Sequence, residues 1–442
     1  MTILGYALAL PPRAGGRKNV AVAGGGPAGL SIAKLLQDAR LANVTVFEGQ
    51  ERLGGKSMTV RFAGATHEMG TCYSTIAHRL TNRWMREMGV RQAPLGQQMV
   101  DGVPLMQFVK SGPGQPLAVE ALRFLSLWRR HQEAVRKLPG HPQVRDECAM
   151  TIGEWLDRHK LVRIRRFMLR ALTNMGYGFL DEVTTLQALR WCTPELILSG
   201  ALGQVKMPLD GWQPFWERLA QGLDVRLSDR VLGVERRNQG VALTTNSGEH
   251  KFDHVILTVA PDEAAKIMRL SADETAASEA LDWGTYVTTL CEVDDWFDAH
   301  EAEAYSATLE PGAERGQMMS ARRLPKAKAA AAAQSANKIY LSGQYGGHLT
   351  GAQLEQRLAK DIGVRGAKLR NVILQKQWKY FPRYRPEAVR QGLVTRMNAL
   401  QGQGGVWWSG SAFSHEAVSN IVSFNQNLVR RMTPALEAVN AS

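Results

Sequence analysis

The clearest pattern in the chain is an apolar run at residues 18–23, then apolar positions at helical spacing over 27–37 and a second apolar run at 44–47. Short continuous apolar runs are typical of strands buried in a parallel sheet, and the helical spacing is typical of a helix that covers such a sheet. The pattern therefore predicts a strand–helix–strand unit near the start of the chain.

The pattern changes twice further along. Residues 122–191 read mainly as helices, with a capping box at Thr151 that opens a helix over 155–161 and a further helix over 162–174. After residue 205, short apolar or alternating runs predict strands. These runs cover residues 225–227, 231–235, 241–245, 254–258, 286–293, 338–345 and 407–410. Residues 418–432 predict a C-terminal helix, and we assign no chemistry to the alanine-rich segment 326–337.

A glycine-rich turn joins the first predicted strand to its helix. Gly24 and Gly26 allow a tight turn and a close approach of the backbone to a pyrophosphate, and Gly29 lets the helix pack closely on the strand. Pro27 and Ala28 open the helix, whose free N–H groups and partial positive charge favour phosphate groups. This turn by itself predicts a dinucleotide site.

Two later segments narrow the prediction to FAD. Glu48 ends the second predicted strand, where a carboxylate accepts hydrogen bonds from the ribose hydroxyls of adenosine. Gly54, Gly55 and Lys56 then offer bare backbone and a cation to the pyrophosphate. The three segments in this order predict FAD as the cofactor.

Length, apolar content and cysteine spacing limit the class of protein. The 442 residues suit two or three domains, and no stretch is apolar enough for a membrane span. The four cysteines are scattered without metal-ligand spacing, so we expect reduced thiols, a cytoplasmic location and no bound metal. The first 18 residues lack the basic segment and long apolar run of a signal peptide.

The net charge of +13 is concentrated in residues 122–170. This basic segment is either solvated helix surface or a docking face for an acidic partner, such as an acyl carrier protein or an anionic lipid surface. No nucleic-acid-binding motif accompanies it, so we expect no nucleic acid partner.

With these segments placed, the chain resembles the flavin-dependent amine oxidase superfamily, which includes monoamine and polyamine oxidases, protoporphyrinogen oxidases and phytoene desaturases. The resemblance rests on the glycine-rich opening, the Glu68-Met69-Gly70 segment and residues 407–411. It implies that Glu68, Met69 and Gly70 lie against the flavin and that the backbone at Val231 meets the adenine.

The same resemblance implies roles for the C-terminal part of the chain. Gly410 and Ser411 would close the flavin site, with Ser411 in the place of the family's usual acidic residue. The helix that follows, with Ser419 and Asn420 in its first turn, would direct its N-terminus at the flavin.

Within this superfamily the chain is similar to polyenoic fatty acid isomerases, through residues 176–178 and 378–382. The similarity implies hydride transfer from an allylic carbon to the flavin and back to another carbon. Two positions depart from that pattern: the arginine that holds the fatty acid carboxylate falls near Gln98, and the aromatic gate falls near Gly200. These replacements favour a larger, neutral or carrier-bound substrate.

Together the segments predict an α/β fold with a discontinuous, Rossmann-like FAD-binding domain at residues 16–75, 205–268 and 400–435. A helical cap, or substrate-access region, is expected at 76–204. A second, sheet-based substrate domain is expected at 269–399.

Few side chains are candidates for chemistry, and we find no compelling acid or base. Tyr177, Trp378 and Tyr380 are candidates for the wall of the substrate site, although each also suits an ordinary core. Lys206 is a candidate to hold a water near the flavin, as the resemblance implies for amine oxidases, although a surface position suits it better. A thioether between Cys72 and the flavin is a disfavoured alternative.

The sequence thus predicts an FAD-dependent enzyme that takes a hydride from an apolar, unsaturated or acyl-type small molecule. The hydride is either returned, which isomerises a double bond, or passed on, which desaturates the substrate. The alternative is an amine or amino acid oxidase that uses oxygen and releases hydrogen peroxide. A third hypothesis, a non-catalytic flavin-binding or docking protein, has only the basic segment in its favour.

Overall fold

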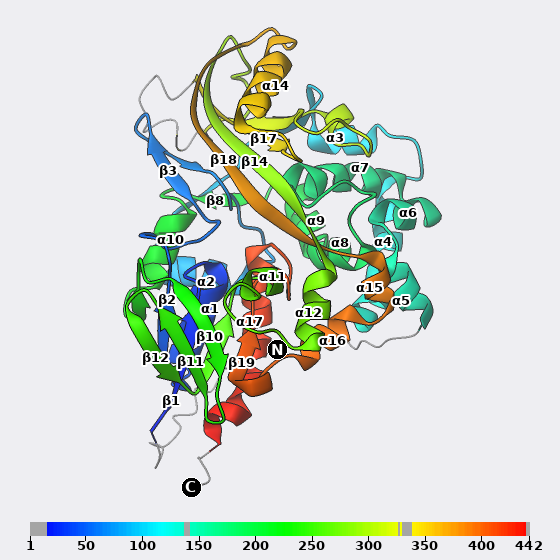
Figure 1. The fold of residues 1–442 in the computed structure, drawn as a ribbon. Helices are drawn as coiled ribbons and strands as arrows, with labels where there is room; N and C mark the ends of the chain where they lie inside the picture. Colours follow the sequence, from blue (N-terminus) through cyan, green and yellow to red (C-terminus); the bar gives the residue numbers. More distant parts are fainter. Residues whose placement is uncertain (1–15, 137–141, 326–327, 329–337, 439–442) are drawn as a thin grey trace.

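A computed structural model describes residues 16–136, 142–325, 328 and 338–438. Five parallel strands in the order β19-β13-β1-β2-β9 form the sheet of the lower lobe (Figure 1). These strands are β1 (Lys18–Ala23), β2 (Ala42–Phe47), β9 (Asp224–Arg226), β13 (His254–Leu257) and β19 (Val406–Trp408). Three separate parts of the chain therefore meet in one sheet.

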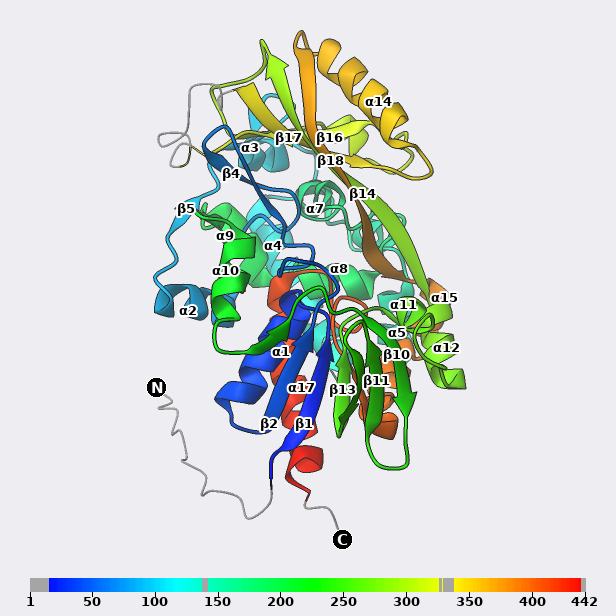
Figure 2. The same ribbon diagram turned by 60° about the vertical axis from the view of Figure 1, so that its left-hand side comes forward.

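Both faces of this sheet are covered, which explains its continuous apolar strands. Helices α1 (Pro27–Asp38) and α17 (Val418–Glu437) pack on one face, where Val20 and Val22 meet Ile32 and Met432. A three-stranded antiparallel sheet packs on the other face, as Figure 2 shows. It comprises β10 (Val231–Arg236), β11 (Val241–Thr245) and β12 (Gly248–Phe252).

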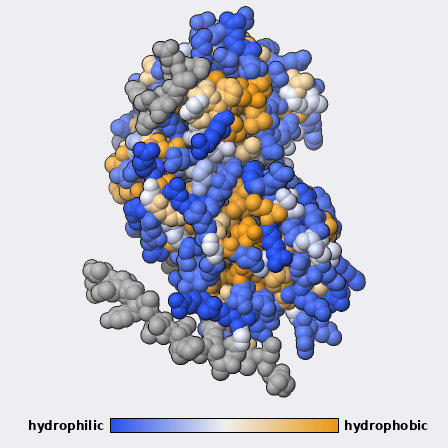
Figure 3. All heavy atoms as spheres, turned by 90° about the vertical axis from the view of Figure 1, so that its left-hand side faces the viewer, coloured by the Kyte–Doolittle hydropathy of each residue, from blue (hydrophilic) through white to orange (hydrophobic). Residues whose placement is uncertain are grey.

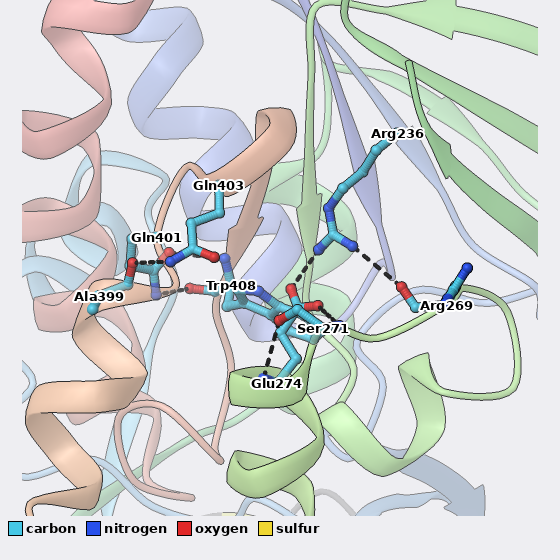
Figure 4. A network of polar contacts seen from close by, with 8 residues as sticks. All are labelled: Arg236, Arg269, Ser271, Glu274, Ala399, Gln401, Gln403 and Trp408. Carbon is cyan, nitrogen blue, oxygen red and sulfur yellow. Dashed lines mark hydrogen bonds and ion pairs between the residues drawn. The ribbon is translucent and has the colours of Figure 1, made fainter. Parts of the chain in front are cut away.

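A network of polar contacts ties this small sheet to its neighbours (Figure 4). Arg236 of β10 contacts the carboxylate of Glu274 and donates to the carbonyl of Arg269. Glu274 also completes the capping box of α12 (Ala272–Glu279) with Ser271. Nearby, the side chain of Gln401 bonds both backbone polar groups of Trp408 in β19.

Helices dominate residues 79–219, as the sequence predicts for much of this range. They are α2 (Arg79–Glu87), α3 (Leu105–Lys110), α4 (Leu117–Arg136), α5 (Pro142–Ala149), α6 (Ile152–Arg158), α7 (Val162–Ala171), α8 (Thr185–Trp191), α9 (Pro194–Ala201) and α10 (Trp212–Leu219). The capping box predicted at Thr151 is confirmed, because its hydroxyl accepts the Glu154 N–H while the Glu154 carboxylate accepts the Thr151 N–H. The alanine-rich segment lies outside the described residues, apart from Lys328.

The upper lobe contains a seven-stranded sheet in the order β18-β14-β17-β16-β15-β6-β7. Its strands are β18 (Lys368–Tyr384), β14 (Leu281–Asp294), β17 (Ile339–Tyr345), β16 (Met318–Arg322), β15 (Ala302–Ala304), β6 (Gln98–Val100) and β7 (Val103–Pro104), and α14 (Gly351–Gly363) packs against it. The long strands β14 and β18 run from the upper lobe down to the boundary with the lower one (Figures 1 and 2). They bring aromatic side chains to that boundary.

Two features of this sheet differ from the sequence prediction. The strand expected at 286–293 begins earlier, at Leu281, because β18 pairs with it along nearly its whole length. Strands β6 and β7 belong to this sheet, although they fall in the range predicted to be helical. β6 pairs in parallel with β15, and strands of two or three residues carry too little pattern to be predicted.

The remaining elements are short. They are β3 (Thr59–Phe62), β4 (Ala65–Glu68), β5 (Gln92–Pro94), β8 (Lys206–Pro208), α11 (Pro261–Ala264), α15 (Pro386–Arg390) and α16 (Leu393–Ala399). Within the described residues, no helix combines the length and apolarity needed to cross a bilayer. Figure 3 shows a mainly hydrophilic surface on one side of the molecule, with hydrophobic atoms gathered in limited areas of both lobes. Exposed apolar side chains of this extent are ordinary for a protein surface.

Candidate functional site

The turn between β1 and α1 has the geometry of a pyrophosphate cradle. Gly24 has a φ of +115°, and a Cβ on Gly29 would lie 1.8 Å from the carbonyl oxygen of Gly24. Glycine is therefore required at both positions. Gly26 is the N-cap of α1 and gives it no side-chain cap, so the first N–H groups of the helix are open to an anion.

Glu48 lies beside this turn. It is 8% exposed, and its two carboxylate oxygens accept the N–H groups of Gly25 and Gln50, each at 2.8 Å. These bonds fix the carboxylate and leave it further lone pairs for ribose hydroxyls. The Asp229 N–H donates to the Glu48 carbonyl at 2.9 Å, which brings the start of β10 at Val231 to the same end of the sheet. This arrangement fits the adenosine of a dinucleotide.

The second glycine pair packs directly against the first turn. The Gly54 N–H donates to the Gly25 carbonyl at 2.9 Å, and a Cβ on Gly55 would lie 3.1 Å from the Cα of Gly26. Gly410 reaches the same place, since Gly410 and Gly24 both lie against Thr258. Glycines from three parts of the chain therefore bring bare backbone together at one place, an arrangement that fits FAD. Ser411 is the next residue in the chain after Gly410.

The segment from Glu68 to Gly70 continues the site toward the upper lobe. A Cβ on Gly70 would lie 1.8 Å from the Lys56 carbonyl oxygen, so the backbones of these segments touch. Met69 is fully buried, and its carbonyl accepts the hydroxyl of Thr288 at 2.7 Å. Glu68 is 2% exposed, and burial raises the pKa of its carboxyl to about 7, although Lys328 and Arg322 oppose this shift.

An aromatic cavity lies at the end of these segments. Its walls include Met69, Gly70, Tyr177, Tyr286, Trp378 and Tyr380. Trp378 donates its indole N–H to the Thr288 hydroxyl at 3.0 Å, and the rings of Tyr177 and Tyr380 stack with centroids 5.7 Å apart. Three of the four catalytic candidates from the sequence therefore meet in one cavity.

The turn that carries Tyr177 is built by its two glycines. Gly176 has a φ of +87° and packs against the ring of Tyr286, and the Gly178 N–H donates to the Tyr345 hydroxyl at 2.6 Å. Burial raises the pKa of Tyr177 and Tyr380, and it raises the pKa of Tyr286 to about 12. These phenols are uncharged near neutral pH, so they form a neutral wall and supply no ready base.

Lys206 does not line this cavity. Its side chain is exposed at the start of the three-residue strand β8, where it borders a separate hollow with Asn82 and Gln92. Cys72 does line the cavity, and burial raises the pKa of its thiol, which disfavours the thiolate.

The N-terminus of α17 points at the aromatic cavity. Glu416, Ala417 and Val418 line it, whereas Ser419 and Asn420 border a different hollow, where Asn420 donates to the Arg190 carbonyl at 2.9 Å. The helix therefore meets the cavity through the residues just before the two that the sequence singled out.

Sequence reasoning missed Glu416. Its side chain is 6% exposed, and one carboxylate oxygen lies 2.8 Å from the Lys56 Nζ while the other is buried without a partner in the described structure. The residues before α17 show no periodic pattern, so only the fold reveals this pair. It places a cation and an anion at the edge of the aromatic cavity.

The structure also places a positive charge near Gln98, where the sequence predicted none. The Gln98 side-chain oxygen accepts a hydrogen bond from Arg170 at 2.8 Å, so a guanidinium lies where the sequence indicated no charge. Arg170 and Gln98 border two further cavities. The inner cavity includes Gly70, Cys72, Arg170 and Arg322, and the outer cavity includes Met106, Phe167, Arg170 and Gly200. Tyr73 and Met175 line both of these and the aromatic cavity, so the three adjoin.

The basic segment is not one exposed face. Arg165 pairs with Glu310 at 3.1 Å, and Arg166 donates to the Phe108 carbonyl at 2.8 Å. Arg170, as above, faces inward. Exposed basic residues of the segment include Arg123, Arg129, Arg158 and Lys160. Helix α7 thus uses its arginines to hold neighbouring segments, which the charge count could not show.

Comparisons with known proteins agree with this geometry. The family model described as "Flavin containing amine oxidoreductase" matches residues 27–362. Polyamine oxidase 4 of Oryza sativa subsp. japonica is 28% identical over 265 residues, which are 54% of this chain and 51% of that protein. The chain spans about half the length of the curated relatives it matches.

Solved structures share the fold over nearly the whole chain. A CLA-producing fatty acid isomerase from P. acnes has a TM-score of 0.80 at 18% identity, covering 94% of this chain and 98% of that one. Cyclohexylamine oxidase from Brevibacterium oxydans IH-35A has a TM-score of 0.68 at 17% identity, covering 96% of this chain and 100% of that one. The comparisons confirm the predicted α/β fold, the resemblance, the enzyme class and FAD as the cofactor.

Proposed function

The chain belongs to the family of flavin-containing amine oxidoreductases, and from this premise we propose that it takes a hydride from an apolar, unsaturated or acyl-type small molecule. FAD, when bound, supplies the acceptor for the hydride and its electron pair. The hydride is then returned to another carbon of the substrate, which isomerises a double bond. Alternatively it is passed on to an external electron acceptor while the substrate cation loses a proton to solvent, which desaturates the substrate.

The observation that carries this proposal is the neutral aromatic wall beside the FAD segments. Tyr177, Trp378 and Tyr380 present apolar ring surface, and burial keeps both phenols protonated. Removal of a proton needs a base with a matched pKa, whereas removal of a hydride needs a dry, oriented substrate. These three side chains supply no such base and do supply the dry surface that hydride removal needs, while the Glu416 carboxylate at the cavity edge is held by Lys56.

The remaining groups at the cavity have positioning and electrostatic roles. The N-terminus of α17 brings a partial positive charge to the cavity, and Lys56 adds a cation whose charge the Glu416 carboxylate, 2.8 Å away, partly offsets. Both favour negative charge that develops on a group bound there. The indole N–H of Trp378, the hydroxyl of Thr288 and the carbonyl of Met69 form a chain of hydrogen bonds that fixes this side of the wall.

An amine oxidase is the second candidate. Two of the relatives compared above carry amine oxidase names, and an aromatic wall also suits a cation. This candidate predicts hydrogen peroxide as a product, which the first candidate does not require.

An anaerobic absorbance experiment separates the two candidates. The purified FAD-loaded protein is mixed with polyunsaturated fatty acids and their thioesters, and separately with amines and amino acids. Product without lasting bleaching of the flavin indicates isomerisation, and bleaching by the acids or thioesters that an added acceptor reverses indicates desaturation. Bleaching by amines alone, reversed by oxygen with release of peroxide, would replace our proposal with the amine oxidase.

Two further points extend the proposal. The exposed residues Arg123, Arg129 and Arg158 support docking of an acidic partner, such as an acyl carrier protein or an anionic lipid surface. Unchanged partner binding after Arg129 and Arg158 are both replaced by Gln would end that idea. The four free cysteines support a cytoplasmic location.

A further inference from the structure

The inner cavity is unusual in its charge. Three arginines line it together with Gly70 and Cys72. Arg170 lies at the end of α7, Arg322 at the end of β16, and Arg323 follows Arg322 directly. It adjoins the aromatic cavity through Cys72, Tyr286 and other shared residues. The fold therefore places the guanidinium groups of Arg170 and Arg322, from two different elements, beside the region where we expect the flavin and the substrate to meet.

Each guanidinium is held by a neutral acceptor. Arg170 donates to the side-chain oxygen of Gln98 at 2.8 Å, and Arg322 donates to the backbone carbonyl of Glu68 at 2.5 Å. Within the described residues, neither arginine forms an ion pair with a carboxylate, and the Nε of Arg170 is buried without a hydrogen-bond partner. The two positive charges are thus fixed in position but not neutralised.

The carboxyl groups nearest to this pair offset its positive charge only in part. Burial raises the pKa of Glu68 to about 7, so its charge is incomplete at neutral pH. Glu301 lines the cavity and its Oε2 accepts the Gln97 N–H at 2.6 Å, so among the described residues a single carboxylate there faces three arginines. Burial lowers the pKa of Arg170, and the charge of Arg322 acts in the same direction. Unpaired charges in such surroundings are costly, and an anion that enters the cavity relieves that cost.

The lining of the outer cavity indicates which chemical groups suit the rest of the substrate. Leu105, Met106, Phe167 and Leu196 form an apolar lining that reaches Arg170. Gly200 stands at the wall without a bulky side chain, although a Cβ there would lie 3.2 Å from the Phe167 ring. A ligand with a charged end and an apolar chain matches this combination of surfaces.

We propose that Arg170 and Arg322 form a binding subsite for the carboxylate of an acid substrate, whose apolar chain lies in the adjoining apolar and aromatic cavities. Two forked guanidiniums suit the two oxygens of a carboxylate and repel an ammonium group. This inference rests on the proposed function and names its substrate class, an organic acid with an apolar chain. It replaces the neutral substrate that Gln98 suggested in the sequence.

Binding of unreactive probes to the FAD-loaded protein tests the subsite apart from catalysis. Octanoate, methyl octanoate and octylamine share an apolar chain, carry no double bond and differ in the charge of the head group. Their affinities are measured by calorimetry and by the change in flavin absorbance. We expect octanoate to bind at least about tenfold more tightly than the ester, and octylamine to bind most weakly.

Substitutions assign the effect to the two arginines. Arg170→Gln and Arg322→Gln should each lower octanoate affinity by about tenfold or more and change ester affinity by less than about twofold. Arg170→Lys and Arg322→Lys keep the charge without the fork and should fall between. Arg83→Gln removes an exposed arginine of α2 and should match the unmodified protein.

Two results would overturn the subsite: equal binding of octanoate and its ester by the unmodified protein, or an unchanged acid-to-ester ratio in both Gln variants. Flavin content and thermal unfolding identify a variant that fails to fold, in which case the Lys variant at that position decides. The proposed function fails separately, since a protein that binds octanoate through the arginines and oxidises only amines would refute the reaction and keep the subsite.

Discussion

The buried carboxyl of Glu68 should make the stability of this protein depend on pH near neutrality. Glu68 is 2% exposed, accepts the hydroxyl of Thr59 at 3.1 Å and accepts the Trp212 N–H at 3.3 Å. Burial is the largest influence on this group, and it raises the pKa from the ordinary 4.5 to about 7. The positive charges of Lys328 and Arg322 and the two hydrogen bonds only reduce the shift.

The sign and size of the effect follow from proton linkage. The folded protein binds this proton more tightly than the unfolded chain, so the stabilising contribution is complete below pH 4.5 and is lost as the pH rises through about 7. The shift between 4.5 and about 7 corresponds to about 3 kcal/mol of unfolding free energy, since one pKa unit is about 1.4 kcal/mol.

The Glu68→Gln variant tests this reasoning, because glutamine keeps an acceptor oxygen and has no charge at any pH. Urea unfolding at about pH 5 and pH 8, with FAD saturating throughout, should show the unmodified protein losing about 2.5 kcal/mol more than the variant. Glu87→Gln, at an exposed position of α2, should keep the pH dependence of the unmodified protein. If Glu68→Gln and the unmodified protein have the same pH dependence, the carboxyl is not titrating as its burial requires.

Four further substitutions test other parts of the structure. Gly29→Ala places a Cβ 1.8 Å from the Gly24 carbonyl oxygen and should cost about 3 kcal/mol and the bound FAD, whereas Gly363→Ala meets no atom within 4 Å and should stabilise α14 by up to about 1 kcal/mol; flavin content and urea unfolding measure both. Thr151→Ala removes the capping box of α6 and should lower the unfolding free energy by about 1 kcal/mol, so an unchanged urea midpoint would contradict it. His415→Phe should raise the unfolding free energy by about 1 kcal/mol, because both ring nitrogens are buried without hydrogen-bond partners in the described structure and burial lowers the pKa to about 3; a loss of stability would show that a nitrogen is used.

The aromatic cavity shows where sequence reasoning reached the site and where it stopped. Tyr177, Trp378 and Tyr380 were singled out from short motifs, and the structure places all three in one cavity. Glu416, which also lines this cavity, came from no pattern because it precedes a helix in an irregular segment. Lys206 lies at the exposed start of β8 and borders a different hollow. A motif fixes which side chains are unusual, but not the direction in which each one points.

The arginines show that the sequence also could not predict where charged side chains lie in the fold. Counting basic residues in 122–170 suggested a surface, yet Arg165 and Arg166 hold neighbouring segments and Arg170 faces a cavity. Gln98 suggested a neutral site, and its own side chain holds a guanidinium from 72 positions away in the chain. The position of a charge depends on long-range pairing of elements, which net charge does not contain.

The sequence by itself determined the features that depend on neighbouring residues. The turn at Gly24 and Gly29 needs bare backbone, the capping box at Thr151 closes over three residues, and the apolar runs of β1 and β2 demand burial on both faces. Tertiary structure alone decided the cavities and the arginine pair, because their walls come from segments that meet only when both sheets and the helical region pack together. Local sterics act over a few residues, whereas a binding site is made by contacts between parts of the chain that are far apart.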